Sequence, residues 1–99
     1  MSSIILNDRF RLLRLALDDI LLLETIKGTD KCSIVTQHGH FILRLRLAEL
    51  KKQLDARFVY ATRSILVNSE KIVEVNRKER TLLLIGGHIR PYTRLFTFK

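Results

Sequence analysis

Short stretches in which apolar and polar residues alternate run through most of the chain, and polar turns separate them. An alternation with a period of two is typical of half-buried β-strands. The sequence predicts eight or more strands, with candidates over residues 4–6, 10–17, 20–26, 32–36, 41–45, 58–61, 64–67, 71–75, 81–85 and 88–92. In the second candidate the apolar phase slips near Leu13 and Arg14, which predicts a β-bulge there.

The apolar period changes once along the chain. Leu47, Leu50 and Leu54 are spaced i, i+3 and i+7 with charged and polar residues between them, which predicts an amphipathic helix of two turns over 47–54. The residue before it, Arg46, is not one of the usual N-cap types. Gly86-Gly87 predicts a tight hairpin between the last two strands. Many short strands with one short helix indicate a single mainly β, sandwich-like domain.

The charge of the chain is strongly positive and unevenly distributed. Lys and Arg outnumber Asp and Glu by 18 to 10, for a formal net charge of +8. Residues 1–26 hold three basic and four acidic residues, residues 27–63 hold eight and three, and residues 64–99 hold seven and three. A polyanion is the expected partner, because neutralising phosphates releases their counterions. Eleven of the 18 cations are Arg, whose planar fork matches phosphate and guanine.

Several other classes of protein are not expected. No apolar run approaches the ~20 residues of a membrane span, and the N-terminus lacks the features of a signal peptide. Cys32 is the only cysteine, so no internal disulfide can form, which fits a cytoplasmic protein. His38-Gly39-His40 has no third metal ligand at a known spacing, and no phosphate-binding loop or nucleophile motif is present. We therefore expect no enzyme activity, no cofactor and no metal site.

A series of landmarks runs the length of the chain in a recognisable order. They are Asp19-Ile20, a strand ending at Glu24, Leu47-x-x-Leu50, Phe58, Arg63-Ser64-Ile65-Leu66-Val67-Asn68, Ile72 and Pro91-Tyr92-Thr93-Arg94. In this order they resemble the LytTR family of bacterial DNA-binding domains over residues 4–98. The block at 63–68 is the most specific part of the resemblance.

The resemblance implies an elongated, mainly β arrangement of about ten short antiparallel strands with one short α-helix, as a single domain over residues 1–99. It also implies that loops read bases in two successive major grooves of duplex DNA. By position, the base contacts fall on Asp30, Lys31, Thr62, Arg63 and Arg94. Arg63 and Arg94 have the side chain that best recognises guanine. Lys27, Lys31, Arg77 and Arg90 are better placed for phosphate contacts, which fix the register of the protein on DNA without reading its sequence.

Three positions depart from the family pattern. Thr62 stands where many members carry His. Asp30 stands where a neutral or basic side chain would approach DNA more easily, and it could accept from cytosine N4 or cap its own loop. The third departure is the missing N-cap before Leu47. Asn68 is expected to hydrogen-bond a turn rather than DNA.

The resemblance further implies a cytoplasmic transcription regulator, the output domain of a response regulator in a two-component system. Its expected partner is double-stranded DNA with repeated half-sites, bound by a chain that is a monomer in solution. The resemblance leaves open whether two copies pair on DNA, whether the domain follows a receiver domain in a longer chain, and whether it has a sensor partner.

Two alternatives remain from the residues alone. A basic β-domain that binds structured RNA needs exposed aromatic rings for stacking on unpaired bases. Phe41, Phe58, Phe96 and Phe98 are expected in the core, which leaves few rings for that purpose. A protein-interaction module would explain the sandwich but not the skewed charge.

Overall fold

The computed structural model describes residues 2–97, and within this range it contains ten strands, one α-helix and two short 3-10 turns. The elements are β1 (Ser3–Asn7), β2 (Leu12–Ala16), η1 (Leu17–Asp19), β3 (Ile20–Thr25), β4 (Cys32–Thr36), β5 (Gly39–Leu43), α1 (Leu47–Gln53), β6 (Phe58–Thr62), β7 (Ile65–Asn68), η2 (Ser69–Lys71), β8 (Ile72–Asn76), β9 (Thr81–Leu84) and β10 (His88–Pro91). The mainly β architecture with one short helix is confirmed. None of the helices in residues 2–97 has the length and apolar character needed to cross a membrane.

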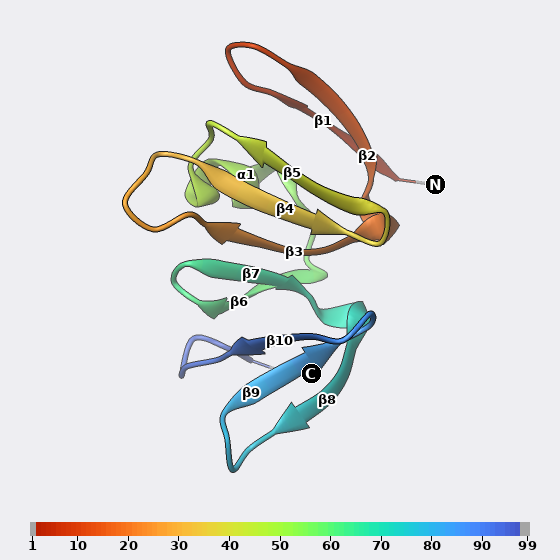
Figure 1. The fold of residues 1–99 in the computed structure, drawn as a ribbon. Coiled ribbons are helices and arrows are strands. Elements are labelled where there is room, and N and C mark those ends of the chain that lie inside the picture. Colours follow the sequence, from red (N-terminus) through yellow and green to blue (C-terminus); the bar gives the residue numbers. More distant parts are fainter. Residues whose placement is uncertain (1, 98–99) are drawn as a thin grey trace.

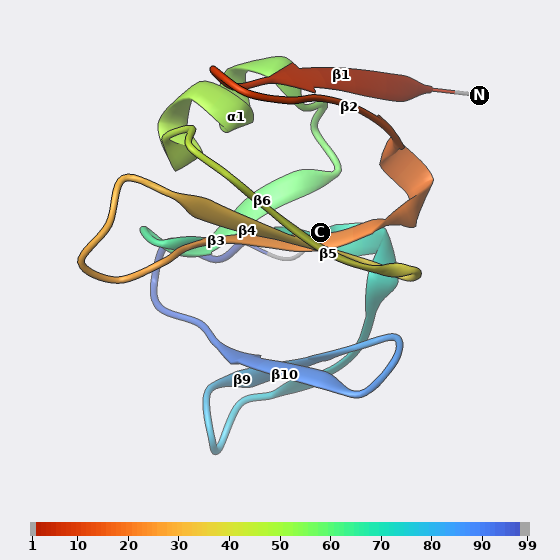
Figure 2. The same ribbon diagram turned by 45° about the horizontal axis from the view of Figure 1, so that its top comes forward.

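The strands form three antiparallel sheets in layers. The central sheet has the order β5-β4-β3-β7-β6, and it lies between the β1–β2 hairpin and the three-stranded sheet β10-β9-β8. Helix α1 shares a side of the central sheet with the β1–β2 hairpin, as Figure 1 and the turned view in Figure 2 both show. The molecule is elongated, with extents of 42 × 33 × 22 Å.

Two hydrophobic cores fill the spaces on the two sides of the central sheet, and β3 contributes to both. Ile20 and Leu23 belong to the core beneath the β1–β2 hairpin and α1, whereas Leu21 and Leu22 belong to the core shared with the three-stranded sheet. The pairing of β3 with β4 shifts register between Ile20 and Leu22, which allows consecutive residues to change sides. A strand segment buried on both faces is expected to be apolar without interruption, as Ile20 to Leu23 are, before β3 ends in the less buried Glu24 and Thr25.

The β-bulge predicted near Leu13 and Arg14 is wrong. The β1–β2 pairing runs without a break through Leu6 opposite Leu13 and Ile5 opposite Arg14. The apolar phase slips because the hairpin lies at the outside of the molecule, where Leu12 stays 64% exposed instead of entering the core. The strand predicted over 10–17 is correspondingly shorter, since Leu17 already lies in η1.

Other local predictions are confirmed with small changes in boundary. Helix α1 begins after Arg46, which provides no side-chain cap. Gly86 and Gly87 turn the last hairpin with φ values of 89° and 87°. The strand predicted over 41–45 is instead β5, which begins two residues earlier and ends at Leu43.

The aromatic residues divide differently from the prediction. Phe58 is fully buried, but Phe41 and Phe96 are half-buried. Phe98, also expected in the core, lies outside the described residues. Among residues 2–97, the most exposed large apolar side chain is that of Phe10, at 73%.

Candidate nucleic-acid interface

One end of the molecule collects most of the positive charge. Successive strands within the antiparallel sheets reverse direction, so their connections alternate between two ends. At the left of Figure 1 lie six segments that we call the cationic edge, namely residues 7–11, 26–31, 44–46, 62–64, 77–80 and 92–95. Together these segments hold eleven Lys and Arg residues and three acidic residues.

The opposite end has the reverse composition. Its connections are residues 17–19, 37–38, 55–57, 69–71 and 85–87, which hold two cations and four acidic residues. Both cations there are engaged by carboxylates: Lys71 Nζ lies 3.3 Å from Asp18 Oδ1, and Arg57 Nε lies 3.0 Å from Asp55 Oδ1. The excess of positive charge is therefore a property of one edge of the fold.

Hydrogen bonds and ion pairs join the upper segments of the cationic edge. The Arg44 amide donates to Asp8 Oδ2 at 3.1 Å, and Arg44 Nε lies 3.8 Å from Asp30 Oδ2. The Thr25 amide, at the end of β3 just before the loop at 26–31, donates to the Ser64 carbonyl at 3.0 Å. These contacts place the turn at 7–11, the loop at 26–31 and the turn at 62–64 in one row.

The lower segments continue this row. The Thr93 amide donates to the Ala61 carbonyl at 2.8 Å, and the Tyr92 amide donates to the Arg80 carbonyl at 3.0 Å. The rings of Tyr92 and Phe96 pack with a centroid distance of 5.2 Å on the two sides of the turn that carries Arg94. Backbone and ring contacts thus fix this turn against β6 and the β8–β9 connection.

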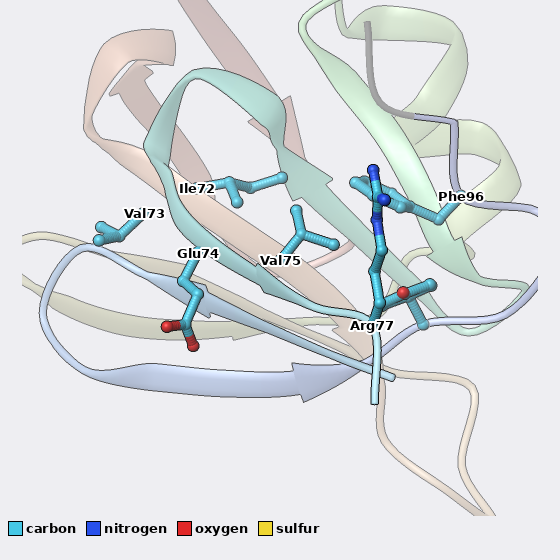
Figure 3. A pocket seen from close by; sticks show the side chains of 7 residues that line it. Ile72, Val73, Glu74, Val75, Arg77 and Phe96 are labelled. Atoms are coloured by element: carbon cyan, nitrogen blue, oxygen red, sulfur yellow. The ribbon is translucent and has the colours of Figure 1, made fainter. Parts of the chain in front are cut away.

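A hollow of about 570 Å³ lies beside the turn that carries Arg94. Figure 3 shows Ile72 and Val75 extending toward Phe96, and Arg77 lines the same hollow. Val73 and Glu74 extend away from that ring. The apolar wall of the hollow belongs to the second core, so it supports the position of the last segment of the cationic edge.

The loop after β3 is closed by local hydrogen bonds. Thr29 Oγ1 donates to the Ile26 carbonyl at 2.8 Å and accepts from the Lys31 amide at 3.1 Å. Gly28 allows the loop to close because it adopts a positive φ of 80°. Thr29, and not Asp30, therefore supplies the side chain that closes the loop, and the Asp30 carboxylate faces Arg44 instead.

The turns that carry the two candidate base-reading arginines are also well defined. Thr62 Oγ1 accepts from the Ser64 amide at 3.1 Å, which leaves Arg63 exposed between them. Arg94 is exposed within a turn closed by the Phe96 amide, which donates to the Thr93 carbonyl at 3.0 Å. Both guanidinium groups are thus carried by fixed backbone and are available to a ligand.

Comparison with known proteins identifies the family. The LytTr DNA-binding domain family matches residues 11–95. The chain belongs to the LytTr DNA-binding domain family. Among solved structures, it is similar to the LytTr DNA-binding domain of a putative methyl-accepting/DNA response regulator from Bacillus cereus, with a TM-score of 0.75 and 18% identity over 94% of this chain and 87% of that chain. This likeness shows a shared fold. No sequence among curated proteins matches the chain significantly.

The LytTr domain holds its candidate site residues in different environments. The candidates for base contacts and the phosphate candidates Lys27 and Arg77 lie on the cationic edge. Arg90 is different, since its guanidinium donates to both carboxylate oxygens of Glu24 at 3.0 and 2.9 Å, and both side chains are only 25% exposed. In the free domain Arg90 is therefore committed to an ion pair.

The prediction that Asn68 bonds a turn is confirmed. Its side chain is fully buried, where it donates to the Ile20 carbonyl at 2.9 Å and accepts from the Glu70 amide at 3.0 Å. It fixes the path of the chain from β7 into η2 and does not reach the surface. The block at residues 63–68 thus joins an exposed Arg63 to a structural Asn68.

Several cations of the cationic edge were not named as site candidates from the sequence. They are Arg9, Arg11, Arg44, Arg46, Lys78 and Arg80. All six lie in the connections that follow β1, β5 and β8, but the sequence alone does not show that these connections meet at one end of the molecule, because that depends on the strand pairing.

Asp8 is a structural acid within this edge, since the backbone amides of Phe10 and Arg44 hold the pKa of its carboxyl below the ordinary value.

Proposed function

We propose that this LytTr domain binds duplex DNA sequence-specifically as a bacterial transcription regulator, with the cationic edge against the DNA. The observation that carries the proposal is the segregation of charge: eleven cations and three acids at one edge, against two cations and four acids at the other. Such a surface gains free energy from counterion release when it meets phosphates. The cytoplasm is the compartment in which it would meet its promoter.

The shape of the domain supports contacts in successive major grooves. Neighbouring major-groove faces on one side of B-DNA are about 34–36 Å apart. The longest extent of the domain is 42 Å, and the cationic edge follows the length of the molecule in Figure 1. Loops at different positions along this edge can therefore meet two turns of the duplex, and two copies can occupy repeated half-sites.

Within this arrangement the candidate residues divide by chemistry. Arg63 and Arg94 read guanine through O6 and N7, while Thr62, Lys31 and Asp30 contact bases beside them. Lys27 and Arg77 hold phosphates. Arg90 joins them only if DNA competes with Glu24 for its guanidinium, since the two are paired in the free domain.

The test distinguishes residues that contact specific bases from residues that contact phosphates. A duplex site is first selected from a random-sequence library with the wild-type domain. Arg63→Ala and Arg94→Ala should each weaken binding to the selected site by about 1–3 kcal/mol and binding to random duplex much less. Lys27→Ala should weaken both duplexes nearly equally and flatten the salt dependence by about one unit. Equal losses on both duplexes for the two Arg variants, with unchanged thermal melting, would make them phosphate contacts.

A further inference from the structure

The tip of the β1–β2 hairpin carries an exposed aromatic ring between two arginines. Phe10 is 73% exposed, and Arg9 Cζ lies 5.7 Å from the centre of its ring. Neither hydrophobic core includes Phe10. The ring contributes little to folding in this position and is accessible to a ligand.

The hairpin tip is held in one conformation. Asp8 Oδ1 accepts from the amides of Phe10 and Arg11 at 2.8 and 2.9 Å, and the Asp8 amide donates to the Arg11 carbonyl at 3.0 Å. The tip is also attached to the central sheet, because Asp8 Oδ2 accepts from the Arg44 amide and the Arg11 guanidinium donates to the Ile42 carbonyl. A ligand would therefore meet a surface that needs little reordering.

A groove of about 320 Å³ separates this tip from the loop after β3, and its lining is Asp8, Phe10, Arg11, Lys31, Ile42 and Arg44. Its apolar wall comes from Phe10 and from Ile42, which is 42% exposed. Its cations are Arg11, Lys31 and Arg44. The single acid, Asp8, already accepts three backbone amides, so its charge repels an anion less than a free carboxylate would.

We propose that this groove, which we call the hairpin groove, and the Arg9 guanidinium beside its Phe10 wall bind a sugar–phosphate segment of the DNA that flanks the bases read by the loops. A nucleic-acid backbone alternates anionic phosphates with apolar faces of deoxyribose, which matches the alternation of cations and apolar side chains in the groove. Every lining residue except Ile42 also belongs to the cationic edge, so one duplex can contact both. This inference rests on the proposed function and assigns residues 7–11 of the cationic edge a contact with the DNA backbone beside the bases that are read.

The test compares two substitutions at the tip with two in the middle of the same hairpin. Arg9→Gln and Phe10→Ala change the tip, whereas Arg14→Gln and Ile5→Ala change a cross-strand pair away from it. The probes are a duplex carrying the library-selected site with about ten flanking base pairs on each side, and the same site trimmed of its flanks. Binding is measured by fluorescence anisotropy, and contacts on the long duplex are mapped by hydroxyl-radical footprinting.

We expect each tip variant to bind the long duplex about five- to tenfold more weakly, to bind the trimmed duplex like the wild type, and to lose protection of one flank. Arg9→Gln should also flatten the salt dependence by about 0.9. Arg9→Lys, which keeps the charge, should retain that salt dependence. The mid-hairpin variants should keep the full footprint, and thermal melting of all the variants checks that the hairpin is intact.

If the tip variants match the mid-hairpin variants on the long duplex while the wild type binds it, the hairpin groove does not bind DNA and the proposed function stands. If the wild-type domain binds no duplex, the proposed function fails and this inference fails with it.

Discussion

Replacing Asn68 with Ala should be among the most destabilising single changes in this domain. The side chain is fully buried and satisfies two backbone groups, the Ile20 carbonyl at 2.9 Å and the Glu70 amide at 3.0 Å. An unsatisfied buried donor or acceptor costs about 1–3 kcal/mol. The Glu70 bond is only partly buried, so water can replace part of it. We therefore expect a loss of roughly 2–4 kcal/mol, from a total stability on the order of 5–15 kcal/mol.

Urea unfolding of the wild type and of Asn68→Ala measures this loss. The matched control is Asn76→Ala, because Asn76 Oδ1 also accepts from a backbone amide, that of Glu79 at 2.9 Å, but in an exposed turn. The control should lose less than about 1 kcal/mol, since water can satisfy the freed amide. On heating, Asn68→Ala should melt about 10–25 °C below the wild type. Equal losses for the two variants would refute the argument that burial makes Asn68 important.

Three further predictions concern single contacts. The backbone amides of Phe10 and Arg44 lower the pKa of Asp8, so the contribution of Asp8 to stability is present above the ordinary pKa of an aspartate and is lost as the pH falls through the lowered value. The difference in unfolding free energy between the wild type and Asp8→Ala should therefore be constant near neutral pH and shrink in acid, which urea unfolding across that range checks. Burial raises the pKa of the Cys32 thiol, so a thiol reagent should label the native domain at least about a hundredfold more slowly than the urea-unfolded chain, and equal rates would place the thiol at the surface. Glu24→Gln removes the charge that holds Arg90 in a bidentate ion pair, so the affinity for duplex DNA should rise and the slope of log K against log salt should steepen by about one unit. Unchanged binding would assign Arg90 a structural role only.

The parts of the fold that depend on neighbouring residues could be predicted from the sequence. The spacing of Leu47, Leu50 and Leu54 predicts α1, and Gly86-Gly87 predicts the last hairpin, because in each case a few consecutive residues determine the conformation. The unbroken apolar run from Ile20 to Leu23 marks the central strand. The phase slip at Leu13 misled the prediction, because pattern alone does not distinguish an apolar residue that changes sides from one that stays exposed.

The candidate site depended more on contacts between distant residues. The ion pair of Arg90 joins residues 66 positions apart in the chain, and nothing local to either residue indicates it. The row formed by the cationic edge likewise follows from strand pairing, which brings Ser64 to Thr25 and Thr93 to Ala61. Composition showed that positive charge was in excess, but only the sheet order shows that one edge carries it.

Binding of the selected duplex site, measured over a range of salt concentrations, tests most directly whether the cationic edge is a DNA-binding surface. If about five to eight phosphates are neutralised, the slope of log K against log salt should be roughly −4.5 to −7. The selected site should also be bound at least about a thousandfold more tightly than random duplex, and more tightly than single-stranded RNA or heparin. A slope shallower than about −2, or equal affinity for selected and random duplex, would contradict the account.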